Sequence, residues 1–83
     1  MKGKDRTPKS HNKTAAIKFG KLVARLRSSK SLTQEKFSEL CGCSPRWLQE
    51  IEAGRQGPSL TYLLKIKKAL GIKWDDLLGD LDK

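Results

Sequence analysis

Apolar residues recur through most of this chain at steps of three and four residues, the spacing that places them on one face of an α-helix. Runs of β-branched residues are few, which argues against a sheet. The first helix is predicted over residues 14–29, and Gly20 inside it, where glycine weakens a helix, indicates a close crossing with another helix. The apolar face of this helix is expected to contain Ile17, Phe19, Leu22, Val23 and Leu26, and its polar face Lys18, Lys21 and Arg25.

Residues 33–54 are predicted to form two short helices around a tight turn. Thr33 and Ser44 each precede a helical pattern, and their hydroxyls can accept hydrogen bonds from the free amides of a first turn. Gly42 suits the positive φ of the turn, and Gly54 suits the left-handed end of the second helix. The expected unit is a helix-turn-helix. Its inward side contains Phe37, Leu40, Cys41, Leu48 and Ile51, and its outward side Gln34, Arg46, Gln49 and Glu50.

Two more helices complete the pattern. Ser59 can cap a fourth helix that ends at Gly71, and the acidic residues that follow Trp74 suit the first turn of a short fifth helix. Trp74 is expected to enter the core, because so small a helix must dock in order to form. The inward residues of the fourth helix would be Leu60, Leu63, Leu64, Ile66 and Leu70. The predicted fold class is all-α, a compact five-helix bundle that contains the helix-turn-helix.

The length of 83 residues fits one domain. Residues 1–13 have five basic residues, one acid and no apolar periodicity, which predicts a basic, flexible N-terminal arm. Residues 14–79 would form the helix-turn-helix domain, and residues 80–83 a short acidic C-terminal tail. Two interpretations of the arm remain open. It is either a solvated tail or a segment that follows the DNA backbone or enters a minor groove through Lys2, Lys4, Arg6 and Lys9.

The formal net charge is +9, and the charged residues are unevenly distributed along the chain. Residues 1–73 carry 17 Lys and Arg against 5 Asp and Glu, whereas residues 74–83 carry 1 against 4. The basic excess favours a phosphate polyanion or an anionic membrane as partner. No apolar run approaches the roughly 20 residues that span a bilayer, and residues 1–13 lack the apolar segment of a signal peptide. We therefore expect an intracellular, cytoplasmic protein that does not enter a membrane.

Catalytic and metal chemistry have little support in the sequence. Cys41 and Cys43 are too close in sequence for a usual structural disulfide or zinc ribbon, and His11 alone does not complete a ligand set. No nucleophile–base spacing is apparent, and a helical unit of this size leaves little room for a pocket that excludes water. We predict no enzymatic activity, no cofactor, no metal and no small-molecule ligand.

The order and spacing of several short motifs resemble the phage-repressor-like helix-turn-helix family, the Cro or XRE type, over residues 17–79. The motifs are F-G-K-L-V-A-R-L-R, L-T-Q-E-K-F-S-E-L-C-G-C-S, W-L-Q-E-I-E-A-G-R, P-S, and L-L-K-I-K-K-A-L-G-I followed by D-L-L. The resemblance implies a lambda-repressor-like fold whose third helix reads the major groove of double-stranded DNA. The function expected from it is that of a bacterial or phage transcriptional regulator associated with the nucleoid, a repressor that occupies a two-fold operator.

Residue roles follow from the same resemblance. Gln34 would contact a phosphate and support the recognition helix. Arg27 and Glu52 match the positions of a partly buried ion pair that is structural in the family, so neither is counted among the DNA-reading residues. The residues that would face the major groove are Ser44, Arg46, Gln49 and Glu50.

The chain departs from the family pattern at four positions. Lys36 replaces the acid that would complete a capping box, and Lys73 replaces the usual cap of the fifth helix. Lys67 falls where a small buried residue is usual, so its amine must reach out to solvent. Pro45 lacks the side-chain hydrogen bond that a Gln or Arg there would make. Base reading is therefore expected to depend on Arg46, Gln49 and Glu50.

Several of these residues allow a second interpretation. Arg46 could hold guanine O6 and N7 or contact a phosphate, and Glu50 could accept from cytosine N4 or only pair with Arg46 one turn away. Trp47 could offer its indole N–H to a phosphate or simply pack. Arg55 and Lys30 could clamp the DNA backbone or remain solvated.

The final ten residues contain more apolar surface than so short a segment needs, which suggests a symmetric homodimer contact through Leu77, Leu78 and Leu81. A dimer would place two recognition helices about 34 Å apart on successive major grooves. The alternative function is an antitoxin or a coactivator-type interaction protein on the same fold. Its charged terminal segments would bind a protein partner, and DNA binding would be secondary.

Overall fold

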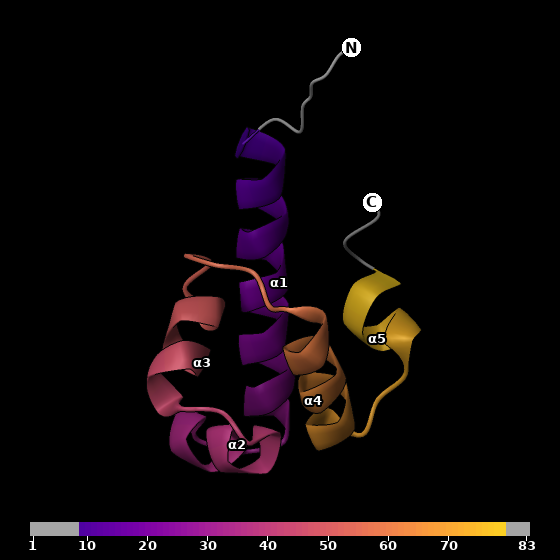
Figure 1. Ribbon diagram of the computed structural model, residues 1–83. Coiled ribbons are helices and arrows are strands. Elements are labelled where there is room, and N and C mark those ends of the chain that lie inside the picture. Colours follow the sequence, from indigo (N-terminus) through magenta and orange to yellow (C-terminus); the bar gives the residue numbers. More distant parts are fainter. Residues whose placement is uncertain (1–8, 80–83) are drawn as a thin grey trace.

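The computed structural model describes residues 9–79, and their side chains from Thr14 onward. This part of the chain consists of the helices α1 (Lys9–Ser29), α2 (Gln34–Cys41), α3 (Pro45–Glu52), α4 (Leu60–Leu70) and α5 (Trp74–Leu78). The long α1 runs through the middle of the molecule, α2 lies near its C-terminal end, and α3 and the α4–α5 pair lie on opposite sides of it (Figure 1). The prediction of an all-α, five-helix bundle is therefore confirmed.

The first helix starts earlier than the sequence pattern predicts. α1 begins at Lys9, five residues before the expected start, so residues 1–13 are not an irregular arm throughout. A helix that is already formed extends at little cost, because each added residue gains one main-chain hydrogen bond. Residues 1–8 and 80–83 lie outside the described residues, as do the DNA contacts expected of Lys2, Lys4 and Arg6 and the expected acidic tail.

Three hydroxyl side chains fix where the shorter helices begin. Thr33 Oγ1 accepts from the N–H of Lys36 at 3.0 Å, and Ser59 Oγ accepts from the N–H of Tyr62 at 3.3 Å. Ser44 does the same for α3. These bonds satisfy amides that have no partner within their own helix. At α5, where Lys73 cannot cap in this way, the Asp76 carboxylate instead accepts from the main-chain N–H of Lys73 at 3.3 Å.

The core lies between the five helices, and each of them contributes to it. α1 packs on α3 and α5, and α2 packs on α3 and α4. Fully buried apolar side chains come from every helix: Val23, Phe37, Leu48, Ile51, Ile66, Leu70 and Leu77. Burial of such side chains is the main term that stabilises a domain of this size.

Several side chains expected to point inward are exposed instead. Leu60 is 71% exposed, Leu40 53%, Leu64 51%, and Ile17 and Trp74 40% each. The physical reason is geometric, since a small bundle covers only a narrow stripe of each helix and the apolar residues here span a wider one. Trp74 therefore does not enter the core as expected, and Lys67 Nζ lies 5.2 Å from the centre of its ring.

Glycine allows α1 and α3 to approach each other closely. A Cβ at Gly20 would lie 2.8 Å from the carbonyl oxygen of Glu52, closer than a real Cβ contact. Gly54, with a φ of 77°, ends α3, and a Cβ there would lie 2.9 Å from Cα of Ile17. The close crossing expected at Gly20 is therefore confirmed, and it brings α3 against the middle of α1.

Candidate nucleic-acid interface

The turn between α2 and α3 sets the direction in which α3 leaves the bundle. Gly42 adopts a φ of 72°, and the N–H of the next residue, Cys43, donates to the carbonyl of Ser38 at 3.0 Å. Ser44 then accepts from the N–H of Trp47 at 3.0 Å, and Pro45 takes the first helical position, where no N–H is needed. The two helices and their turn form the helix-turn-helix predicted from the sequence.

α3 presents one buried face and one exposed face. Leu48 and Ile51 are fully buried, which fixes the inward face. Ser44, Arg46 and Gln49, three of the four residues expected to face the major groove, are exposed, and the fourth, Glu50, is half-buried. This short helix therefore offers side chains that can donate to and accept from base edges while its other side is held by the core.

An ion pair joins the ends of α1 and α3. Arg27 Nε donates to Glu52 Oε2 at 2.7 Å and its Nη2 donates to Glu52 Oε1 at 3.1 Å, a bidentate arrangement. Arg27 Nη1 also donates to the carbonyl of Leu32, in the loop before α2. The side chains are only 16% and 7% exposed. The geometry matches the structural pair expected at these two positions.

Gln34 belongs to the same hydrogen-bonded network. Its Nε2 donates to Glu52 Oε1 at 2.9 Å, so the first residue of α2 is tied to the last residue of α3. Glu52 thus accepts three hydrogen bonds from two different elements, which compensates for withdrawing its charge from water. Because an amide nitrogen carries two hydrogens, one remains for an outside acceptor such as a phosphate.

Glu50 lies between two arginines. Arg55 Nε donates to Glu50 Oε1 at 2.9 Å, and Arg46 Nε lies 3.9 Å from Glu50 Oε2. The hydrogen bond from Arg55, supported by the positive charges of Arg55 and Arg46, holds the pKa of Glu50 below its usual range, so the carboxylate is charged at neutral pH. The sequence suggested pairing with Arg46. The contact with Arg55, five residues away and past the end of α3, was not expected.

Trp47 packs against a residue that the sequence analysis missed. Its ring centre lies 4.2 Å from that of Tyr62 in α4, with an angle of 32° between the planes, and Lys65 Nζ lies 5.0 Å from the Tyr62 ring centre. This pair connects α3 to α4. The packing interpretation of Trp47 is therefore supported by geometry. Tyr62 itself carries no signal in the sequence, because its partner is 15 residues away.

The two cysteines are free thiols beside the turn. Burial and the neighbouring Cys43 raise the pKa of the Cys41 thiol to about 12, and burial also raises the pKa of Cys43. Neither thiol is therefore a thiolate at neutral pH. Within the described part of the chain, no three His, Cys, Asp or Glu side chains gather in a way that could hold a metal ion.

The remaining predicted residues are distributed around the molecule. Lys30 is exposed in the turn after α1, and Arg55 is exposed just past α3. Leu77 is fully buried in the chain's own core, because α5 docks through it, so its assignment to a dimer surface is wrong. Leu78 is half-buried, and Leu81 lies outside the described residues.

Comparison with known proteins extends this picture. A family model described as a helix-turn-helix domain matches residues 18–81, which is most of the chain. The chain belongs to this helix-turn-helix family. Its similarity to the Cro and XRE type of DNA-binding transcriptional regulator, inferred above from motifs, is thereby confirmed. The expectation that this regulator is not an enzyme is also confirmed, since the family is non-enzymatic.

Individual relatives of this regulator agree with the assignment. It is 41% identical over 61 residues to control protein C.BamHI of Bacillus amyloliquefaciens, covering 72% of this chain and 75% of the relative. It is 36% identical over 64 residues to the uncharacterized HTH-type transcriptional regulator y4dJ of Sinorhizobium fredii, covering 77% of this chain and 83% of the relative. The crystal structure of the restriction-modification controller protein C.AhdI from Aeromonas hydrophila superposes with a TM-score of 0.72 at 34% identity. The match covers 75% of this chain and 94% of the C.AhdI chain.

In residues 9–79, no helix combines the length and the apolar character that crossing a bilayer requires.

Proposed function

We propose that this regulator binds double-stranded DNA in a sequence-specific way by inserting α3 into the major groove, and that it represses transcription by occupying its site. The observation that carries the proposal is the outward face of α3, where Arg46 and Gln49 are exposed on a helix anchored by Leu48 and Ile51. Arg can hold guanine O6 and N7, and Gln can hold adenine N6 and N7. Pro45 has no donor, so these two residues carry most of the base reading.

Contacts to the DNA backbone would come from residues around α3. Gln34 keeps one amide hydrogen beyond its bond to Glu52, while Lys30 and Arg55 are exposed on either side of the helix-turn-helix. Ser44 is exposed at the start of α3 although its hydroxyl caps that helix. Such contacts fix the position of a protein on the duplex without reading sequence. As a DNA-binding protein, the regulator would act inside the cell, at the bacterial or phage nucleoid.

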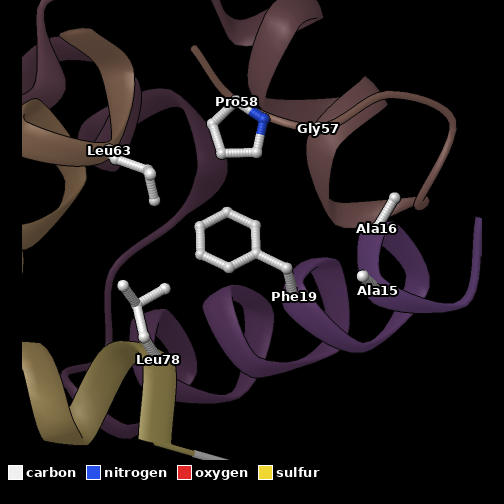
Figure 2. Close-up of a pocket in the computed structure, with 7 residues that line it drawn as sticks. All are labelled: Ala15, Ala16, Phe19, Gly57, Pro58, Leu63 and Leu78. Atoms are coloured by element: carbon white, nitrogen blue, oxygen red, sulfur yellow. The ribbon is translucent and has the colours of Figure 1, made fainter. Parts of the chain in front are cut away.

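A second copy of this chain is the proposed partner in DNA binding. Leu60 and Leu64 of α4 and Trp74 of α5 expose apolar surface. An open groove of about 350 Å³ is lined by Phe19, whose ring lies between Pro58 and Leu78 (Figure 2). Its other lining residues are Ala15, Ala16, Gly57 and Leu63.

The charges around this surface support a two-fold contact. Lys67 and Lys68 lie at the end of α4, and Asp75 and Asp76 lie at the start of α5. In a symmetric interface the basic end of α4 in one copy can contact the acidic start of α5 in the other. The two-fold axis then repeats this contact with the two copies exchanged. The proposed surface includes the half-buried Leu78 and also Leu81, which lies outside the described residues, whereas Leu77 is buried within its own chain.

Selection of bound sequences from a random duplex pool tests the function. At about 150 mM salt, non-specific binding through phosphates is weakened enough for a preferred sequence to emerge. The proposal expects a two-fold motif for the natural protein and a degraded motif for Arg46→Ala. Enrichment of no motif, together with a stoichiometric protein partner recovered from native extract, would favour the antitoxin or coactivator alternative.

A further inference from the structure

Glu50 is more sheltered than the two arginines that it binds. Its side chain is 25% exposed, whereas those of Arg46 and Arg55 are 85% and 63% exposed. The two carboxylate oxygens are divided between the arginines, with Oε1 facing Arg55 and Oε2 facing Arg46. A carboxylate in this position is poorly placed to reach a base edge beyond the guanidinium groups.

The contacts with Glu50 are made through the Nε atom of each arginine. The two terminal nitrogens of each guanidinium carry four of its five N–H donors. Those terminal nitrogens can form the paired hydrogen bonds with guanine or phosphate that make arginine useful in DNA recognition. Glu50 therefore restrains the inner side of each guanidinium and leaves its outer side open.

We propose that Glu50 is a positioning residue that directs Arg46 toward a base edge and Arg55 toward the backbone, and that it reads no base itself. The inference rests on the DNA binding by α3 proposed above. It has a second consequence, because the negative charge of Glu50 lowers the positive charge of the reading surface by one unit. Attraction to phosphates, which is independent of sequence, is thereby weakened relative to base reading.

Replacement of Glu50 by Gln removes the charge with little change of shape. We expect affinity for random-sequence duplex to rise by about 3- to 10-fold, because both arginines gain freedom to contact phosphates. The ratio of specific to non-specific affinity should fall by about 10-fold, because a loosened arginine loses part of its discrimination for guanine. The matched control is Glu39→Gln, which removes the same charge from a 72% exposed position on α2 and should leave the ratio unchanged.

The selected motif distinguishes positioning from base reading. If Glu50 positions Arg46, the Glu50→Gln variant should show a weaker guanine preference at the position that Arg46 reads and no change elsewhere. A lost cytosine preference at another position, with the guanine preference intact, would overturn the proposal, as would an unchanged specificity ratio. In an Arg55→Gln background, Glu50→Gln should have a smaller effect on non-specific affinity, because one of the two arginines that it restrains is gone.

A measurement without DNA separates this inference from the proposed function. The Nε–H of Arg55 should exchange with solvent more slowly in the natural protein than in Glu50→Gln, by several-fold, because a charge-assisted hydrogen bond protects it. Equal exchange rates would overturn the inference even if the protein binds DNA specifically. Slow exchange combined with the absence of any preferred sequence would instead show that the proposed function has failed.

Discussion

Gly20 of α1 lies so close to Glu52 of α3 that a Cβ at Gly20 would be 2.8 Å from the Glu52 carbonyl oxygen. The side chain of the same Glu52 is held by Arg27, two turns further along α1, and by Gln34 of α2. Glu52, the last residue of α3, is therefore fixed through both its main chain and its carboxylate. This arrangement sets the angle at which α3 projects from the bundle.

The substitution Gly20→Ala should strongly destabilise the protein. The added methyl group meets main-chain carbonyls, which cannot rotate away, so we expect the free energy of unfolding to fall by about 3 kcal/mol. Denaturant unfolding followed by circular dichroism measures the change. Gly57→Ala is the control, since a Cβ there meets nothing within 4 Å, and it should change stability by less than about 0.5 kcal/mol. Equal effects of the two substitutions would contradict the close crossing.

The substitution Glu52→Ala should destabilise the fold rather than remove a DNA contact. Removing the carboxylate leaves the partly buried Arg27 guanidinium without its bidentate partner, a loss of about 3 kcal/mol. Unfolding in urea provides the measurement, and Glu39→Ala, at a solvated position, provides the control. A Glu52→Ala variant as stable as this control would show that the pair does not hold α3 in place.

The contact between Trp47 and Tyr62 should be detectable as a coupling energy. A double-mutant cycle with Trp47→Leu and Tyr62→Leu is expected to give about 0.5–1.5 kcal/mol, the range for a pair of packed aromatic rings. The variant Tyr62→Phe retains the ring and should retain the coupling. Strictly additive effects of the two leucine substitutions would mean that the rings pack independently.

Self-association should depend on the exposed leucines of α4. A charge introduced by Leu64→Glu would have to be desolvated in the proposed interface, so we expect the dimerisation constant to weaken by at least about 10-fold. Leu40→Glu places the same charge on an exposed leucine of α2 and should have no such effect. Sedimentation equilibrium measures both. A natural protein that remains monomeric at high micromolar concentration would rule out the proposed dimer.

The sequence predicts where the helices lie better than it predicts which of their apolar side chains are exposed. Caps such as Ser44 and stops such as Gly54 act locally, so the residue type alone indicates where α3 begins and ends. Exposure of Leu60 and Leu64 depends instead on how much of α4 its neighbours cover, which is a property of the assembled bundle. The start of α1 was misjudged for a related reason, because a stable helix can extend into a stretch that lacks an apolar pattern.

The candidate site was predicted in part. The pairing of Arg27 with Glu52 followed from resemblance to a family, and the exposure of Arg46 and Gln49 followed from helical periodicity. The contact between Arg55 and Glu50 could not be predicted, because Arg55 lies beyond the helix and its side chain can take several directions. The positive φ of 59° at Ser31 could not be predicted either, because a serine in the sequence does not indicate a left-handed conformation.

One substitution in the DNA tests the proposed contact between Arg46 and guanine in the major groove. Replacing that guanine by 7-deazaguanine in the selected site removes the N7 acceptor and preserves base pairing. The natural protein should bind the altered site about 5- to 10-fold more weakly, because one hydrogen bond of the bidentate contact is lost. The Arg46→Ala variant should bind both sites equally. An equal loss for both proteins, or no loss for the natural protein, would contradict reading of the major groove by Arg46.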